Sequence, residues 1–394
     1  MVSQAAVRVF LVLGVLWMLA QGSLFLAFGI RHGHDTPRYV EGAIAMLRGE
    51  LPHGKGGSYL GYAAVVATAR LAGLGDGGII LFQVLFSGIA AVATYAIGTK
   101  LFDHRTGLVA ALLFLGFLKL HPWNFFILTD SLFISLSIIS IALVLHARSW
   151  PLSVLTAVVL FWTTFLRPNG FIVPLAVVSA ALVVWSLQKR FAAVGATILG
   201  LDLVAPLLLP VVGGMASHER ILLYYKEGTV IPGYEQLRVL PPAAAAAWPT
   251  ASTSLLKDLA RIWILEPVYS LKLAAAKLTA FVLTIRPYHH WWYNLLIAAT
   301  LYPLYILAAL GIRRGSRDQY GKVLLLTFVI MQTLLVMVTF DDWSGRFLLP
   351  VLPVVFVFAA ATLAPRLPAV LRTAMQAGLP AAVPGLLLGW WRRR

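Results

Sequence analysis

The sequence has no cysteine and few charged residues. Among its 394 residues, Asp, Glu, Lys and Arg together make up only 12%, while hydrophobic residues make up 60%. The absence of Cys excludes a disulfide framework and a thiolate metal site. Soluble domains usually contain about 25% charged residues. The composition therefore predicts an integral membrane protein and leaves little room for a soluble domain.

Acidic residues are scarcer than basic ones, with 15 Asp and Glu against 31 Lys and Arg, for a formal net charge of +16. A basic excess of this size can indicate nucleic-acid binding. In a membrane protein, it is more simply explained by basic cytoplasmic loops that face anionic lipid. We therefore expect membrane lipids, and no nucleic acid, as partners.

Long apolar runs recur along the chain, and a bilayer crossing needs roughly 20 such residues. Arg8 precedes the first run, which is longer than the apolar region of a signal peptide and is interpreted as a retained span. The segments 59–74 and 268–285 are short or contain Lys, so we predict surface-lying helices there, with a true crossing as the alternative. The ten predicted spans are 9–30, 77–99, 107–120, 131–145, 151–166, 170–187, 191–212, 292–312, 323–340 and 347–363.

These patterns predict an all-α, polytopic membrane protein with about 10 transmembrane helices and juxtamembrane helices in the outer loops. One of the latter is expected from residue 36, because Pro37 suits a first helical turn. A long loop of mixed polarity is predicted at 213–267. We expect one transmembrane domain over 1–363 and a basic, membrane-associated tail over 364–394.

The basic turns around Lys100, Lys189 and Arg313 are predicted to lie on the cytoplasmic side. This topology puts a separate set of charged residues at the outer mouths of the spans. A charged group at membrane depth costs roughly 2.5–3.5 kcal/mol, so their convergence predicts a polar cavity. The set is Asp35, Asp130, Arg167, Asp341, Asp342 and Arg346.

Two of these acids could take part in chemistry. Asp35 follows the first span, and a carboxylate there can accept a proton from a hydroxyl group. The alternative is a solvated loop acid or a helix N-cap beside Pro37. Asp130 lies between two apolar runs. It too could be a helix cap, although a cap does not explain why the acid is embedded in apolar sequence.

Arg167, in Arg-Pro-Asn-Gly, and Arg346 are candidate anion ligands, because a guanidinium suits a lipid phosphate and can stabilise a phosphate leaving group. The alternative is an arginine that extends its charge to the membrane surface. The His-x-His pattern at His32 and the pairs His289-His290 and Asp341-Asp342 are weak metal signatures. We therefore predict no metal.

The layout resembles the GT-C superfamily of membrane glycosyltransferases, which includes protein O-mannosyltransferases and lipid A aminoarabinose transferases. The resemblance lies in the acid after the first span, the segment 100–113, the Leu-Thr-Asp-Ser-Leu around Asp130, the Arg167-Pro168 turn and the segment 345–353. One departure is that Thr36 follows Asp35, where the protein mannosyltransferases have a second acid.

The resemblance implies transfer of a sugar from a polyprenyl-phosphate-linked donor to an acceptor hydroxyl, with inversion at the anomeric carbon. Asp35 would be the general base, and Asp130 would shape the pocket or orient the acceptor or an arginine. The substrate-binding residues implied are Arg167, Arg346, Asp342, Arg38 and Tyr39.

No cofactor is expected, and the acceptor could be a lipid, a glycan or a protein. We expect a multi-pass protein of a bacterial inner membrane, with its active site facing the periplasm. Three alternatives remain open: a transporter or flippase for a lipid-linked sugar, a polysaccharide polymerase and a non-catalytic scaffold. A transporter requires alternating access, for which the sequence shows no repeat or pair of broken helices. Loss of turnover on mutation of Asp35 would separate an enzyme from a scaffold.

Overall fold

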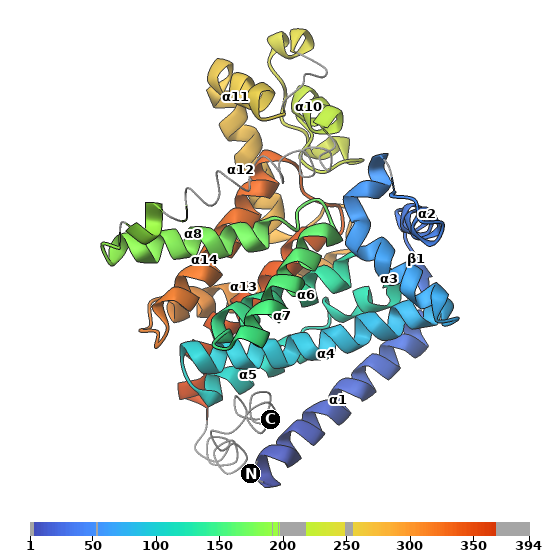
Figure 1. The fold of residues 1–394 in the computed structure, drawn as a ribbon. Coiled ribbons are helices and arrows are strands. Elements are labelled where there is room, and N and C mark those ends of the chain that lie inside the picture. Colours follow the sequence, from blue (N-terminus) through green and yellow to red (C-terminus); the bar gives the residue numbers. More distant parts are fainter. Residues whose placement is uncertain are drawn as a thin grey trace.

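The computed structural model describes residues 4–52, 54–190, 192–195, 197, 218–248 and 255–367. Helices dominate these ranges, as the sequence predicts, and the long ones lie side by side in a bundle (Figure 1). The helical class is therefore confirmed. The tail predicted over 364–394 and the span predicted over 191–212 lie mostly outside the described residues.

Four segments in the described part of the chain are long and apolar enough to cross a membrane. They are α4 (Gly75–Leu101), α13 (Trp291–Ile312), α14 (Gln319–Val338) and the segment Arg346–Arg366, which combines η5 (Arg346–Val351), α15 (Leu352–Leu363) and η6 (Ala364–Arg366). These helices support a membrane protein, and each overlaps a predicted span.

Shorter apolar helices coincide with further predicted spans. They are the Trp17–Phe28 part of α1 (Gln4–Phe28), α5 (His104–Gly116), α6 (Asp130–His146), α7 (Trp150–Leu166) and α8 (Ile172–Leu187). Because these apolar stretches are shorter than a full crossing usually requires, about ten crossings stays a prediction.

The α15 helix lies at the centre of the main core. Nearly all of its side chains are buried, and it packs against α13, α5 and α4. Gly311 of α13 lies directly against the backbone of Phe358, leaving no room for a β-carbon. Small residues let helices approach closely in this way where the hydrophobic effect cannot drive their association.

Two shorter helices lie beside the bundle at the end where α4 begins. The first, α2 (Thr36–Leu47), has Pro37 in its first turn as predicted and is followed by η1 (Gly54–Tyr59). The second, α3 (Leu60–Leu71), packs against α2, α4 and α7. Twelve residues of α-helix are too few to cross a bilayer, which favours a surface position for α3.

A second, smaller core forms where the sequence predicted a long loop followed by a surface-lying helix. It contains α10 (His218–Glu227), η3 (Glu235–Leu237), η4 (Ala243–Ala247), α11 (Leu255–Leu265) and α12 (Pro267–Leu283). Buried apolar side chains such as Leu222, Tyr225 and Leu273 hold these helices together. Lys277 of α12 is fully buried, 4.3 Å from the ring centre of Tyr225, and donates to the carbonyl of Thr339 at 2.7 Å. This Lys thus packs inside the protein.

Candidate functional site

A short parallel pairing of strands brings the two candidate acids together. β1 (Arg31–His32) follows α1, and β2 (Phe126–Ile127) precedes α6, with Arg31 opposite Phe126 and His32 opposite Ile127. Asp35 and Asp130 each lie three residues beyond the second member of this pairing. Because parallel strands run in the same direction, equal offsets deliver both carboxylates to the same end of the bundle.

Asp35 occupies the position before α2 but makes no side-chain cap. The local turn is instead closed by Thr36, whose Oγ1 accepts from the N–H of Gly33 and donates to the carbonyl of Ile127, both at 2.8 Å. The carboxylate of Asp35 pairs with Arg38 at 3.3 Å, and 23% of its side chain is exposed. It therefore remains open to solvent or substrate.

Asp130 is the first residue of α6 and likewise makes no side-chain cap, and neither does Thr129. It is only 1% exposed. One carboxylate oxygen accepts from Arg167 Nη1 at 2.8 Å, and the other accepts from Arg346 Nη1 at 3.3 Å. Buried charges persist when they are paired and hydrogen-bonded in this way, so Asp130 fixes two arginines.

The Arg167 turn follows α7 and closes with a hydrogen bond from Gly170 N to the carbonyl of Arg167 at 2.8 Å. Gly170 lies so close to the carbonyl of Thr163 that no β-carbon fits. The guanidinium of Arg167 lies 5.2 Å from the ring centre of Phe133 and 5.5 Å from that of Phe347. Between two rings and Asp130, this arginine is held in one position.

Arg346 lies at the centre of the site and pairs with three acids. It lies 3.3 Å from Asp130, 3.1 Å from Asp342 and 3.9 Å from Asp35, and 21% of its side chain is exposed. It follows Gly345, whose φ of +69° is readily adopted only by glycine. This turn directs the chain from α14 into η5, with Arg346 pointing at all three acids.

A second buried ion pair lies beside Arg346. Arg286, which follows α12, donates to Asp341 and also to the carbonyl of Asp342, and both charged side chains are fully buried. Asp342 accepts from the N–H of Ser344 at 2.9 Å. The Asp341 N–H donates to Val230 at 3.1 Å, which joins the site to the second core.

Arg38 and Tyr39 lie on the first turn of α2 beside Asp35. The guanidinium of Arg38 lies 5.6 Å from the ring centre of Tyr59. Tyr39 is 2% exposed, and its ring packs edge-on against Tyr59 and Tyr62. Burial raises the pKa of the Tyr39 hydroxyl, which therefore stays protonated. The structure thus places all the predicted substrate-binding residues around the two acids.

Three residues of this region were not predicted to belong to it: Lys119, Thr284 and Arg286. Lys119 lies at the end of the predicted span 107–120, and a single Lys in an apolar run was the available signal. Its Nζ is buried and has no hydrogen-bond partner. Thr284 and Arg286 follow α12 and gave no sequence signal that would place them here.

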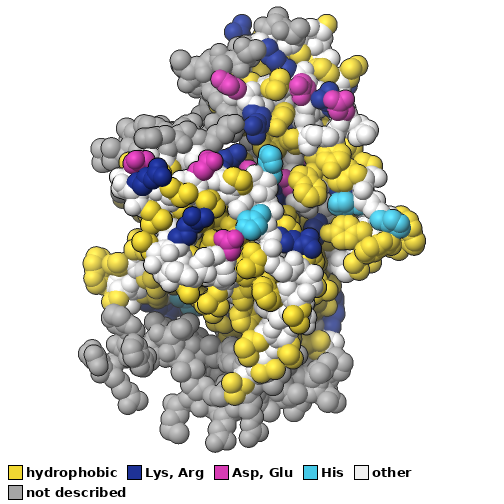
Figure 2. Space-filling model, turned by 90° about the vertical axis from the view of Figure 1, so that its right-hand side faces the viewer, with side chains coloured by type: hydrophobic (Ala, Val, Ile, Leu, Met, Phe, Trp, Pro, Cys, Tyr) yellow, Lys and Arg dark blue, Asp and Glu magenta, His cyan; other side chains and the backbone are white. Residues whose placement is uncertain are grey.

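Charged side chains gather on one face of the molecule. Figure 2 shows Lys, Arg, Asp, Glu and His side chains across its middle and upper parts, while hydrophobic side chains dominate below. Within the described ranges, no three His, Asp or Glu side chains come together in a way that could hold a metal ion. The arrangement suits acid–base chemistry next to a bound anion.

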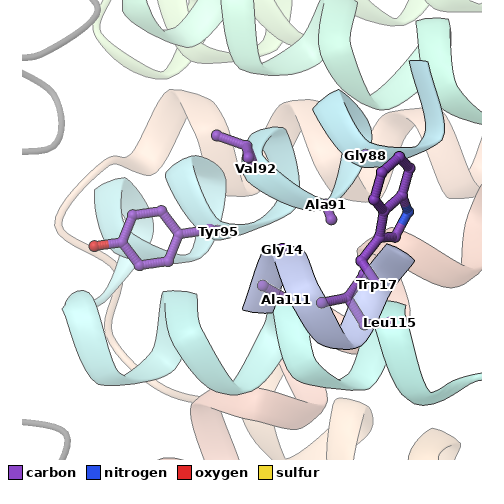
Figure 3. Close-up of a pocket in the computed structure, with 8 residues that line it drawn as sticks. All are labelled: Gly14, Trp17, Gly88, Ala91, Val92, Tyr95, Ala111 and Leu115. Atoms are coloured by element: carbon purple, nitrogen blue, oxygen red, sulfur yellow. The ribbon is translucent and has the colours of Figure 1, made fainter. Parts of the chain in front are cut away.

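A separate apolar cavity of about 140 Å³ lies between α1, α4 and α5 (Figure 3). It is lined by Gly14, Trp17, Gly88, Ala91, Val92, Tyr95, Ala111 and Leu115. The lining contains no charged group. Its chemistry fits an apolar chain rather than a reaction, so the charged cluster remains the candidate site.

No family model and no curated protein matches this sequence. Among solved structures, the chain is similar to an oligosaccharyltransferase from Archaeoglobus fulgidus, determined in complex with Zn and sulfate. The match has 14% sequence identity and a TM-score of 0.47, and it covers 95% of this chain. The chain spans about half (51%) of the length of that enzyme.

The case for function depends on the geometry of the charged cluster.

Proposed function

We propose that this protein transfers a sugar from a polyprenyl-phosphate-linked donor to an acceptor hydroxyl group, with inversion, at the outer face of a membrane. The proposal rests mainly on the arrangement of two acids around one arginine. Arg346 joins an accessible carboxylate, Asp35, to a buried one, Asp130, and neither acid caps the helix at whose start it lies. Two acids in different environments with a shared cation are suited to different tasks in one reaction.

Asp35 is the proposed general base. Its carboxylate is partly exposed and makes no backbone hydrogen bond as a helix cap, so it can accept a proton from an acceptor hydroxyl. As the proton leaves, the hydroxyl oxygen attacks the anomeric carbon of the donor. The bond from that carbon to the phosphate oxygen breaks, and its electron pair leaves with the phosphate. A single displacement of this kind inverts the anomeric centre.

Asp130 is a proposed positioning residue. It is buried and fixes Arg167 and Arg346 through hydrogen bonds at 2.8 and 3.3 Å. Arg346 keeps part of its side chain exposed and can stabilise charge that develops on a departing phosphate. Arg167, Asp342, Arg38 and Tyr39 complete the proposed substrate-binding set. The proposed acceptor is a lipid, a glycan or a protein, and the proposed location is a bacterial inner membrane with the site in the periplasm.

The test is sugar transfer in proteoliposomes, with a panel of radiolabelled polyprenyl-phosphate sugars as donors and a membrane extract as acceptor. Wild type is compared with Asp35→Asn, which keeps the shape of the side chain but removes its basicity. Asp103→Asn is the matched control, because Asp103 caps a helix at the other end of the bundle. A general base contributes about 10²–10⁴-fold to rate, so transfer should fall by this factor in Asp35→Asn alone.

Transfer that survives Asp35→Asn would remove this residue from the proposed role while keeping the enzyme class. Labelled donor that crosses the bilayer without any transfer would instead indicate a transporter. Equal loss in Asp35→Asn and Asp103→Asn would show a general folding defect rather than a catalytic one.

A further inference from the structure

Lys119 has an unpartnered charge inside the protein. It lies in the turn between α5 and the short helix η2 (His121–Phe125), and its Nζ is buried without a hydrogen-bond partner. The neighbouring arginines differ in this respect, because Arg167, Arg286 and Arg346 each bind a carboxylate. Leaving a buried ammonium unpaired is costly, and a bound anion would remove that cost.

Thr284 provides a second, independent sign of a ligand. It ends α12 with a φ of +50°, a left-handed conformation that is strained for a β-branched residue. Its hydroxyl group is buried and also lacks a partner. Strained backbone of this kind persists where surrounding structure imposes it, and it clusters at functional sites.

Lys119 and Thr284 meet at Gly345. A β-carbon placed on Gly345 would lie 3.5 Å from the Nζ of Lys119 and 3.3 Å from the Cγ2 of Thr284. The next residue is Arg346, which contacts both candidate acids. The ammonium of Lys119 and the side chain of Thr284 therefore both lie beside Gly345, next to the residue that contacts the two candidate acids.

We propose that Lys119 and Thr284 form the binding subsite for the donor phosphate. The inference rests on the proposed function and names the groups that hold its leaving group. Charge balance supports an anion at this place. In the cluster, the acids Asp35, Asp130, Asp341 and Asp342 are paired with the arginines Arg38, Arg167, Arg286 and Arg346. Lys119 adds one positive charge that no carboxylate balances.

In this scheme, the Lys119 ammonium stays protonated throughout and makes a charge-assisted hydrogen bond to a phosphate oxygen. When the bond from the anomeric carbon to oxygen breaks, the phosphate gains negative charge beside that ammonium, which stabilises it. The acceptor proton passes to Asp35, so no further reactant is needed. Burial, with a further contribution from Arg286, lowers the pKa of Lys119 to about 8, so most of the side chain is protonated at neutral pH.

The experiment measures binding without turnover. Farnesyl phosphate and farnesol, two short isoprenoids that differ only in the phosphate, are titrated into the full chain in nanodiscs, and dissociation constants are measured by calorimetry. Wild type should bind farnesyl phosphate at least tenfold more tightly than farnesol. Lys119→Met should abolish most of that preference, whereas Lys119→Arg should retain it. Lys322→Met, which removes a partly exposed Lys at the opposite end of the bundle, should behave as wild type.

Thr284→Val provides a second variant if Lys119→Met does not fold. It keeps the β-branched shape and removes the hydroxyl group, so it should weaken farnesyl phosphate binding about tenfold. Equal affinity for the two isoprenoids, absence of binding to both, or an unchanged preference in both variants would each overturn the assignment. Asp35→Asn should still bind farnesyl phosphate. This variant therefore separates a failure of the proposed catalysis from a failure of the phosphate subsite.

Discussion

At the end of the bundle where α4 meets α5, Asp103 and Asp318 act as ordinary helix caps. Asp103 accepts from the N–H of Thr106 at 2.8 Å, and Asp318 accepts from that of Gly321 at 2.9 Å. At the opposite end, Asp35 and Asp130 also lie at helix starts, but neither makes a side-chain cap. The same residue type at the start of a helix is thus used in two ways.

The difference is in the partners that each end provides. Asp318 has Lys100 at 3.5 Å in addition to its backbone bond, which suits a partly exposed structural position. At the site end, both carboxylate oxygens of Asp130 accept from arginines in distant parts of the chain, and those of Asp35 pair with Arg38 and Arg346. A cap can be replaced at small cost, whereas removing one member of a buried ion cluster leaves charges uncompensated. The comparison therefore predicts very different mutational sensitivities.

The largest effect is expected for Asp130→Ala. The substitution leaves Arg167 buried without its carboxylate, and breaking a buried pair by removing one partner costs about 3–5 kcal/mol. The free energy of unfolding, measured in mixed micelles, should fall by that amount, and sugar transfer should be lost. If the free energy of unfolding falls by less than about 1 kcal/mol, this cluster contributes no more to stability than the helix caps at the other end.

A smaller effect is expected for Arg167→Lys. Lys keeps the charge but loses the planar guanidinium that lies between Phe133 and Phe347. The stacking and one charge-assisted hydrogen bond together account for about 2 kcal/mol. Thermal unfolding should show this loss, and the affinity for the donor should fall less than in Lys119→Met, because the positive charge is kept. If donor affinity falls as much as in Lys119→Met, Arg167 binds the donor phosphate directly.

The pH dependence of kcat/KM for the donor should reveal the ionisation of the Lys119 side chain. This parameter reports the ionisation of the free enzyme, and burial lowers the pKa of Lys119 to about 8. Above that pH, the ammonium loses its proton and its affinity for phosphate, so kcat/KM should fall about tenfold per pH unit. In Lys119→Arg, the cation stays charged, and the profile should be flat to at least pH 9. A fall that persists in this variant would assign the ionisation to another group.

Much of the helical framework was predictable, because apolar runs mark helices independently of tertiary contacts. The predicted spans 151–166 and 292–312 lie within one residue of α7 and α13. The first turn of α2 was predictable from Pro37. The second core was not, since its segment is mixed in polarity and its helices α10 and α11 are stabilised by burial against one another. α11 does carry an apolar stripe at helical spacing, but nothing in that stripe indicates which helix packs against it.

The site was predictable as a set of residues but not as a geometry. Asp35, Asp130, Arg167 and Arg346 were selected because charge is costly next to apolar spans, and the structure brings them together. The two-residue strands that align the acids are too short to leave a periodic pattern. Lys119 and Thr284 each lie close to Gly345, and these residues belong to three distant segments, so nothing in the local sequence indicates their proximity.

The smallest effect, and the control for the whole comparison, is expected for Asp103→Ala. Loss of an N-cap hydrogen bond costs about 1 kcal/mol, because it leaves only the N–H of Thr106 without its side-chain partner. Unfolding in mixed micelles should show this modest loss, while sugar transfer and farnesyl phosphate binding stay within twofold of wild type. A strong loss of activity in Asp103→Ala would show that aspartates at both ends support function, and the distinction between capping and non-capping acids would then no longer identify the site.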